Sequence, residues 1–123
     1  MNYSETAEFA RDFKRLLKKF PSLTEDLAVV KQYDIELFHC QKIDRHGISK
    51  IENVGNSEYL QFFKIKKFAC KALKGRGSKS GIRVIYAFHC ANLKIDFIEI
   101  YFKGDRENED RERIKEYLKK FVS

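Results

Sequence analysis

The sequence lacks acidic residues over a long central stretch, because none occurs from Tyr59 to Lys94. This acid-free window holds nine lysines and arginines, so only 16 of the chain's 25 cations remain to balance all 18 acids elsewhere. The net positive charge of the chain is therefore local. A patch of one sign on a small domain is typical of a protein that binds a polyanion, and nucleic acid is the usual one.

Other scarcities narrow the class of protein. Tryptophan is absent and proline occurs once among 123 residues, and we find no linker, so we expect a single domain over residues 1–123. No apolar run approaches the roughly 20 residues needed to span a bilayer, and the N-terminus, MNYSETAEF, has no signal-peptide pattern. Three cysteines without a CxxC fit a reducing compartment. We therefore expect a cytoplasmic protein with no membrane segment.

Apolar periodicity predicts two helices early in the chain. A short extended segment, 2–6, precedes them as an expected edge strand. From Phe9 to Phe20 apolar residues recur at helical spacing with cations on the other face, and Pro21 ends this helix. The sequence Ser22–Glu25 has the pattern of a capping box for a second helix. Since the connection is so short, the two helices should form an antiparallel hairpin.

The rest of the chain favours strands, followed by a last helix. Residues 44–56 are polar and contain two glycines, so we expect a loop there. Residues 60–70, 82–89 and 93–102 are β-prone, and the last two should form a hairpin. The strand at 93–102 is apolar on both faces, which predicts a central position, and 107–121 should be a charged helix. The expected fold class is α+β, with an N-terminal helical hairpin packed on a small antiparallel β-sheet and a C-terminal helix.

Three cations in the acid-free window are candidates for chemistry. Strand alternation places Lys64 and Lys66 on one face, and Arg83 joins them if the neighbouring strands pair. Lysines crowded by like charge can have a lowered pKa and accept protons, and an arginine can hold a phosphate by two hydrogen bonds. The competing interpretation is a solvated strand edge that prevents aggregation. These residue types support binding to nucleic acid phosphates, and both interpretations of the lysines remain open.

Three short motifs resemble the RelE/ParE toxin superfamily, and most closely its RelE- and HigB-type members. They are Phe63–Lys67 (FKIKK), Gly81–Tyr86 (GIRVIY) and Ile98–Asp105 (IEIYFKGD), and Glu8–Leu16 is similar to the first helix of those toxins. The resemblance covers most of the chain except 35–58. It implies a helical hairpin packed on a small antiparallel sheet. Many members cleave mRNA in the ribosomal A site without a metal ion and are neutralised by a cognate antitoxin.

The resemblance also implies roles for individual residues. Lys64 or Lys66 would be the base or a phosphate binder, and Arg83 would stabilise the phosphorane. Lys103 or Arg106 is similar to a basic residue that follows the last strand. The expected RNA contacts are Lys67, Lys71, Lys74, Arg76, Lys79, Lys103 and Arg106. We expect no metal or other cofactor. The expected partners are mRNA on the ribosome and an antitoxin protein. The expected assembly is a homodimer or a toxin–antitoxin hetero-oligomer.

The sequence departs from the family pattern in two ways. Its C-terminal helix is longer and better patterned than in the most active RelE-type enzymes, and it lacks the tyrosine that RelE-like members often use. No tyrosine follows the last strand closely, and Tyr117 falls on the apolar stripe of the last helix, so the general acid is unassigned. ParE-type members share the fold but inhibit DNA gyrase. The alternatives to an endoribonuclease are therefore a gyrase inhibitor without nuclease activity and an RNA-binding domain that has lost catalysis.

A few other residues invite a functional interpretation. The dipeptide His-Cys occurs at 39–40 and 89–90, and with Cys70 it suggests a metal site, but its spacing does not fit one. His46 lies in a polar loop outside the region of resemblance. Glu99 lies in an apolar strand and needs a partner if buried. That partner could be Arg83 or a strand lysine, and the alternative is exposure to solvent or to a helix lysine.

Overall fold

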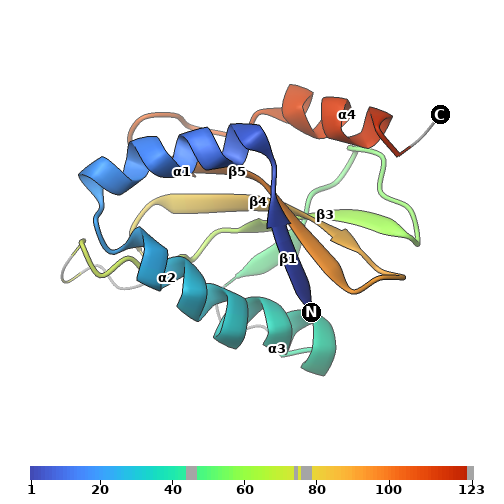
Figure 1. Cartoon of the computed structure of the whole chain (residues 1–123), viewed down its shortest axis with the longest axis horizontal. Helices are drawn as coiled ribbons and strands as arrows, with labels where there is room; N and C mark the ends of the chain where they lie inside the picture. Colours follow the sequence, from blue (N-terminus) through green and yellow to red (C-terminus); the bar gives the residue numbers. More distant parts are fainter. Residues whose placement is uncertain (44–46, 74, 76–78, 122–123) are drawn as a thin grey trace.

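The computed structural model describes residues 1–43, 47–73, 75 and 79–121, and its centre is a five-stranded β-sheet. The strands are β1 (Asn2–Glu5), β2 (Ile48–Lys50), β3 (Leu60–Ile65), β4 (Ile82–His89) and β5 (Lys94–Phe102), in the spatial order β1-β5-β4-β3-β2 (Figure 1). All neighbouring pairs are antiparallel except β1 and β5, which are parallel. The sheet is thus mixed, which corrects the expectation of a purely antiparallel one.

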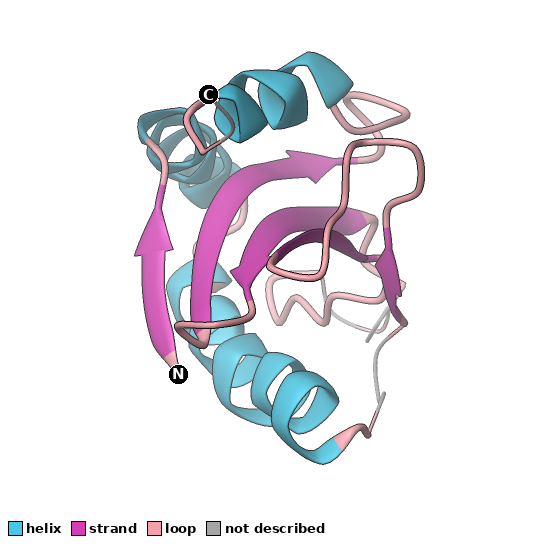
Figure 2. Ribbon diagram, turned by 90° about the vertical axis from the view of Figure 1, so that its right-hand side faces the viewer, coloured by secondary structure: helices cyan, strands magenta, loops and turns pink. Residues whose placement is uncertain are grey.

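Helices cover both faces of this sheet (Figure 2). They are α1 (Ala7–Lys19), α2 (Leu23–Val30), a π-helical turn η1 (Lys31–Ile35), α3 (Glu36–Gln41) and α4 (Arg111–Lys119). The apolar residues of α1 and α2 form one core with one face of the sheet, whereas α4 builds a second core on the other face. None of the helices in the described part of the chain combines the length and the apolar character that crossing a bilayer requires.

Strand β5 is central, as its double-sided apolar pattern predicted. It lies between β1 and β4, and Phe97 and Ile100 belong to the first core while Ile98 and Tyr101 belong to the second. The strands β4 and β5 begin and end within one residue of the expected positions. Opposite Ile85 and Tyr86 the ladder skips Ile98 of β5, which lies between the partners Phe97 and Glu99, so the alternation of faces shifts on β5 at this bulge.

The N-terminal expectations are met in part. The edge strand is confirmed as β1, and the fold therefore begins with a strand of the sheet rather than with a helical hairpin. Helix α1 ends at Lys19, just before Pro21, as predicted. The capping box is wrong, because Ser22 has helical backbone angles and makes no side-chain cap. Its hydroxyl instead donates to Asp26 at 2.6 Å and accepts from the backbone N–H of Ala72 at 2.8 Å.

Three segment boundaries differ from expectation. The loop expected at 44–56 contains β2, which pairs Ile48 with Ile65 at the edge of the sheet. The strand that starts at Leu60 ends at Ile65 rather than at 70. The last helix begins at Arg111 rather than 107, because the Asp110 side chain caps it by accepting from the N–H of Glu112 at 3.1 Å.

Candidate functional site

Lys64 lies in a row of paired residues that crosses strands β3, β4 and β5. Lys64 on β3 pairs with Ile85 on β4, and Ile85 pairs with Glu99 on β5. Because Ile85 belongs to the core under α4, this row lies on the face of the sheet that α4 covers. Lys64 and Glu99 are therefore on the same face, separated by one strand.

A second row lies two residues further toward the end of β5. Arg83 on β4 pairs with Tyr101 on β5. Since side chains two residues apart on a strand share a face, Arg83 and Tyr101 lie on the same face as Lys64. Lys66 is the first residue after β3, next to Ile65, which pairs with Val84. The structure thus brings Lys64 and Arg83 to one end of one face, with Lys66 directly beyond the end of β3.

Lys64 is held by an acid that the sequence did not point to. Its ammonium donates to the Oε1 atom of Glu109 at 2.7 Å, and the two side chains are only 15% and 10% exposed. Burial on its own would lower the pKa of Lys64. The hydrogen bond to Glu109, together with the nearby Tyr101 hydroxyl, outweighs this effect of burial and raises the pKa above its ordinary value. The expectation of a lysine pKa lowered by crowding is wrong here, since the close neighbour is a carboxylate.

Lys66 and Arg83 have no such compensation. Lys66 is exposed, and only its backbone N–H is engaged, donating to the carbonyl of Gly47 at 3.2 Å. Arg83 is half-buried, and its guanidinium donates to the backbone carbonyl of Ile82 at 3.3 Å. Neither side chain forms an ion pair with any residue that the structure describes. Both charges are therefore available to an incoming anion.

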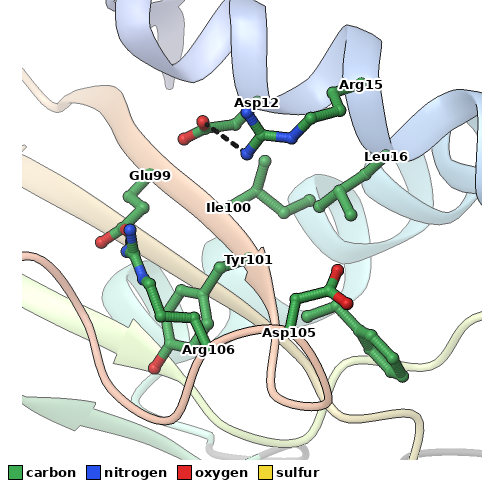
Figure 3. Close-up of a pocket in the computed structure, with 9 residues that line it drawn as sticks. Asp12, Arg15, Leu16, Glu99, Ile100, Tyr101, Asp105 and Arg106 are labelled. Atoms are coloured by element: carbon green, nitrogen blue, oxygen red, sulfur yellow. Dashed lines mark hydrogen bonds and ion pairs between the residues drawn. The ribbon is translucent and has the colours of Figure 1, made fainter.

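Glu99 is buried and its partner is Arg106. Only 1% of Glu99 is exposed, its carboxylate forms an ion pair with the Arg106 guanidinium, and it also accepts the backbone N–H of Asp110 at 2.9 Å. The Arg106 guanidinium lies 5.2 Å from the centre of the Tyr101 ring (Figure 3). The open question about Glu99 is thus answered by a residue beyond the strand, and neither Arg83 nor a strand lysine is its partner.

A pocket of about 330 Å³ adjoins this end of β5 and runs toward α1 (Figure 3). Asp12 lines it and is almost fully buried, and its carboxylate is held by Arg15 at 3.2 Å and by Arg113 of α4 at 2.5 Å. The remaining lining residues are Leu16, Glu99, Ile100, Tyr101, Phe102, Asp105 and Arg106. The charged walls of the pocket are already paired within the protein.

The other predicted RNA contacts differ in exposure and in the partners that they have. Lys67, Lys79 and Lys103 are exposed. Lys71 lies beside the start of α2, on the opposite face of the sheet, where its backbone N–H donates to Asp26 and its ammonium pairs with Glu25 at 3.6 Å. Lys74, Arg76 and His46 fall outside the described residues.

The two histidines of the repeated His-Cys dipeptide serve different cores. His39 bonds through Nε2 to the hydroxyl of Tyr86 at 2.7 Å, in the core under α1 and α2. His89 bonds through Nε2 to the hydroxyl of Tyr117 at 2.6 Å, and that hydroxyl donates to Asp96 at 2.8 Å on the α4 side. The two dipeptides therefore do not converge on one site, and Tyr117 is a core residue as expected.

Two residues of the site were not found from the sequence. Tyr101 lies two residues after Glu99 on the same face of β5 and pairs with Arg83, so the predicted β4–β5 hairpin could have indicated it. Glu109 comes from the loop before α4, 45 residues after Lys64, and no pattern in the sequence links the two.

Comparison with known proteins adds a similarity of fold. No family model matches the chain, and no curated protein matches it. A chain in the crystal structure of the archaeal RelE–RelB complex from Pyrococcus horikoshii OT3 superposes with a TM-score of 0.50 at 12% sequence identity. The match covers 84% of this chain and 94% of that one. At this identity the similarity concerns the fold alone, which is the RelE-like fold that the sequence motifs implied.

Proposed function

We propose that this chain is the toxin of a toxin–antitoxin pair and acts as a metal-independent endoribonuclease on mRNA bound to the ribosome. The observation that supports the proposal is that Lys64 and Arg83 share one face of a RelE-like fold, with Lys66 directly after β3. These are the residues for which the sequence motifs imply a role in cleavage. The similarity to a chain of a RelE–RelB complex supports an antitoxin as the partner.

The chemistry of such a site needs cations more than any other group. When the ribose 2′-oxygen attacks the adjacent phosphorus, negative charge builds up on the phosphorane oxygens, and fixed donors in a partly dry site stabilise it. The uncompensated guanidinium of Arg83 suits two parallel hydrogen bonds to this group, and the exposed Lys66 adds a point charge beside it.

The partners follow from the same charge distribution. The exposed Lys67, Lys79 and Lys103 would bind RNA phosphates around the site. An antitoxin could silence the toxin by laying acidic side chains over Lys66 and Arg83, since complementary charge gives such a complex both speed and specificity of association.

Induced expression in a bacterium with early mapping of transcript ends tests the proposal. We expect new ends at codon boundaries that disappear when translation is blocked. A second candidate, inhibition of a topoisomerase without cleavage, is favoured by the ion pairs that already neutralise Lys64 and Arg106. Growth arrest with intact transcripts and double-strand DNA breaks would establish that second function in place of the first.

Arg83→Ala is the most direct test of the site. The change removes an uncompensated donor from the proposed phosphorane, so cleavage in a ribosome-based assay should fall about 10²–10³-fold. Lys94→Ala is the matched control, because Lys94 lies in the same acid-free window but at the opposite end of β5. Equal activity of both variants, with thermal unfolding unchanged, would remove Arg83 from the mechanism.

A further inference from the structure

The ion pair between Lys64 and Glu109 is largely enclosed by the protein. Its two side chains are 15% and 10% exposed, and the ammonium also lies 5.7 Å from the centre of the Tyr101 ring. The carboxylate is fixed at its other oxygen too, because Glu109 Oε2 accepts from Arg111 Nε at 3.3 Å. Glu109 is thus anchored to the start of α4, and through it Lys64 is held in one orientation.

The surroundings of Lys64 favour one protonation state. Glu109 faces it from the loop before α4 and Tyr101 faces it from β5, while its strand neighbours in register are Ser49 on β2 and Ile85 on β4. Glu109 is the carboxylate in direct contact with the ammonium among the described residues. A lysine is already charged at neutral pH, and the contact with Glu109 raises the pKa of Lys64 further, so Lys64 is poorly suited to accept a proton.

We propose that Glu109 is a positioning residue that holds Lys64 as an ammonium beside Arg83, so that Lys64 gives the proton to the leaving 5′-oxygen during cleavage. This inference rests on the proposed nuclease function and assigns the general acid that the sequence left open. It also reassigns Lys64, because a base or a simple phosphate binder was the role implied by the family resemblance.

The step balances without any further reactant. The 2′-oxygen forms a bond to phosphorus and its proton passes to water, while the bond from phosphorus to the 5′-oxygen breaks. Lys64 protonates that 5′-oxygen, which gives a 5′-hydroxyl and a 2′,3′-cyclic phosphate, and the neutral amine then takes a proton from water. An ammonium is a far stronger acid than an alcohol, so the transfer is downhill once the bond to phosphorus breaks.

A substrate with sulfur in place of the 5′-oxygen separates this role from others. A thiolate leaves without being protonated, because thiols are much stronger acids than alcohols. Ribosome-bound mRNA with a single 5′-bridging phosphorothiolate at the cleavage position is compared with the ordinary mRNA. Lys64→Ala should be about 10²–10⁴-fold slow on the oxygen substrate and near wild type on the sulfur one. Arg83→Ala should be slow on both.

Glu109→Gln tests the positioning role, and Glu107→Gln is its matched control, since Glu107 is exposed in the same loop. Glu109→Gln should raise the ratio of sulfur to oxygen cleavage rates, as Lys64→Ala does but by a smaller factor, whereas Glu107→Gln should leave the ratio unchanged. A merely structural Glu109 would slow both substrates equally. Because Gln is close in shape to Glu, this variant decides the matter even where Lys64→Ala does not fold.

The outcomes separate the inference from the function on which it rests. If wild-type protein cleaves neither substrate on the ribosome, the nuclease proposal fails and this inference fails with it. If wild type cleaves both but Lys64→Ala is equally slow on both, the nuclease stands and the assignment of Lys64 as proton donor is overturned. Faster cleavage by Glu109→Gln would also overturn it, because Glu109 would then be competing with RNA for Lys64.

Discussion

Individual cations of the candidate site fall into two groups, according to whether the protein supplies a carboxylate for them. Lys64 and Arg106 are paired with Glu109 and Glu99, whose side chains are almost fully buried. Lys66 and Arg83 are not paired within the described residues. An incoming phosphate is therefore attracted first to the unpaired cations, whereas the paired ones have fixed positions and protonation states.

His39 should make the stability of the fold depend on pH. Burial, helped by the nearby charge of Lys42, lowers the pKa of His39 from 6.5 to about 4. The unfolded chain therefore binds a proton at a higher pH than the folded one, and His39 should stabilise the fold fully above about pH 6.5 and progressively less as the pH falls toward 4. Urea unfolding of wild type and His39→Gln at about pH 7 and about pH 4.5 measures this.

The difference between the two proteins isolates His39 from the carboxylates that titrate in the same range. Wild type should lose more of its free energy of unfolding on acidification than His39→Gln does. An identical loss in both would mean that the hydrogen bond between His39 and Tyr86 does not depend on a neutral imidazole.

The residues of the site were predictable to the extent that strand periodicity governs them. The alternation in β3 and the pairing with β4 place Lys64 and Arg83 on one face, as expected from spacing, whereas Lys66 lies beyond the end of β3. The pKa direction of Lys64 was not predictable, because it depends on Glu109, whose position is fixed by a loop and a helix that come much later in the chain.

Among the secondary-structure elements, α1 and α4 are joined by one ion pair at the end of the sheet. Asp12 on α1 is buried and is held by two arginines, Arg113 of α4 with a 20% exposed side chain and Arg15 with a 72% exposed one. The pKa of Arg113 is raised, chiefly by its hydrogen bonds to Asp12. The two arginines thus pair with the same carboxylate, one largely buried and the other exposed to solvent.

Arg113→Ala should cost more stability than Arg15→Ala. Without Arg113 the buried Asp12 loses its closest charged partner, and we expect a loss of about 2–3 kcal/mol in the free energy of unfolding. The exposed pair with Arg15 should contribute about 0–1 kcal/mol. Urea unfolding of the two variants measures the difference. A larger loss for Arg15→Ala would mean that the α1–α4 contact is not what anchors Asp12.

The elements that sequence patterns located well are those with strong and long signals. Strands β4 and β5 are rich in β-branched and aromatic residues over their eight and nine residues. Helix α1 has apolar residues at helical spacing over its 13 residues. Strand β2 was missed because Ile48–Lys50 is short and is stabilised by pairing with β3 rather than by its own composition. Ser22 has the residue type of a helix cap, but Asp26 and Ala72 compete for its hydroxyl.

At the scale of the whole molecule, folding divides the acid-free window. Lys64 and Arg83 lie on the face that α4 covers, whereas Lys71 lies beside α2 on the opposite face. Acids from elsewhere in the chain, Glu109 and Glu25, then pair with two of these lysines. The charge offered to a polyanion is therefore smaller than the sequence suggests, because two lysines of the window are paired within the protein.

The salt dependence of RNA binding tests this division, with two lysines of the same window as a matched pair. For single-stranded nucleic acid each neutralised phosphate contributes about 0.7 to the slope of log K against log salt. Lys66→Ala should reduce the slope for a single-stranded RNA by about that amount, because Lys66 is exposed and forms no ion pair with the residues that the structure describes. Lys71→Ala should change it much less, since Lys71 is paired with Glu25 on the opposite face. Fluorescence anisotropy over a series of salt concentrations measures both slopes. Equal reductions would mean that RNA contacts both faces of the sheet, and the RNA-binding surface would then not be confined to one side of the molecule.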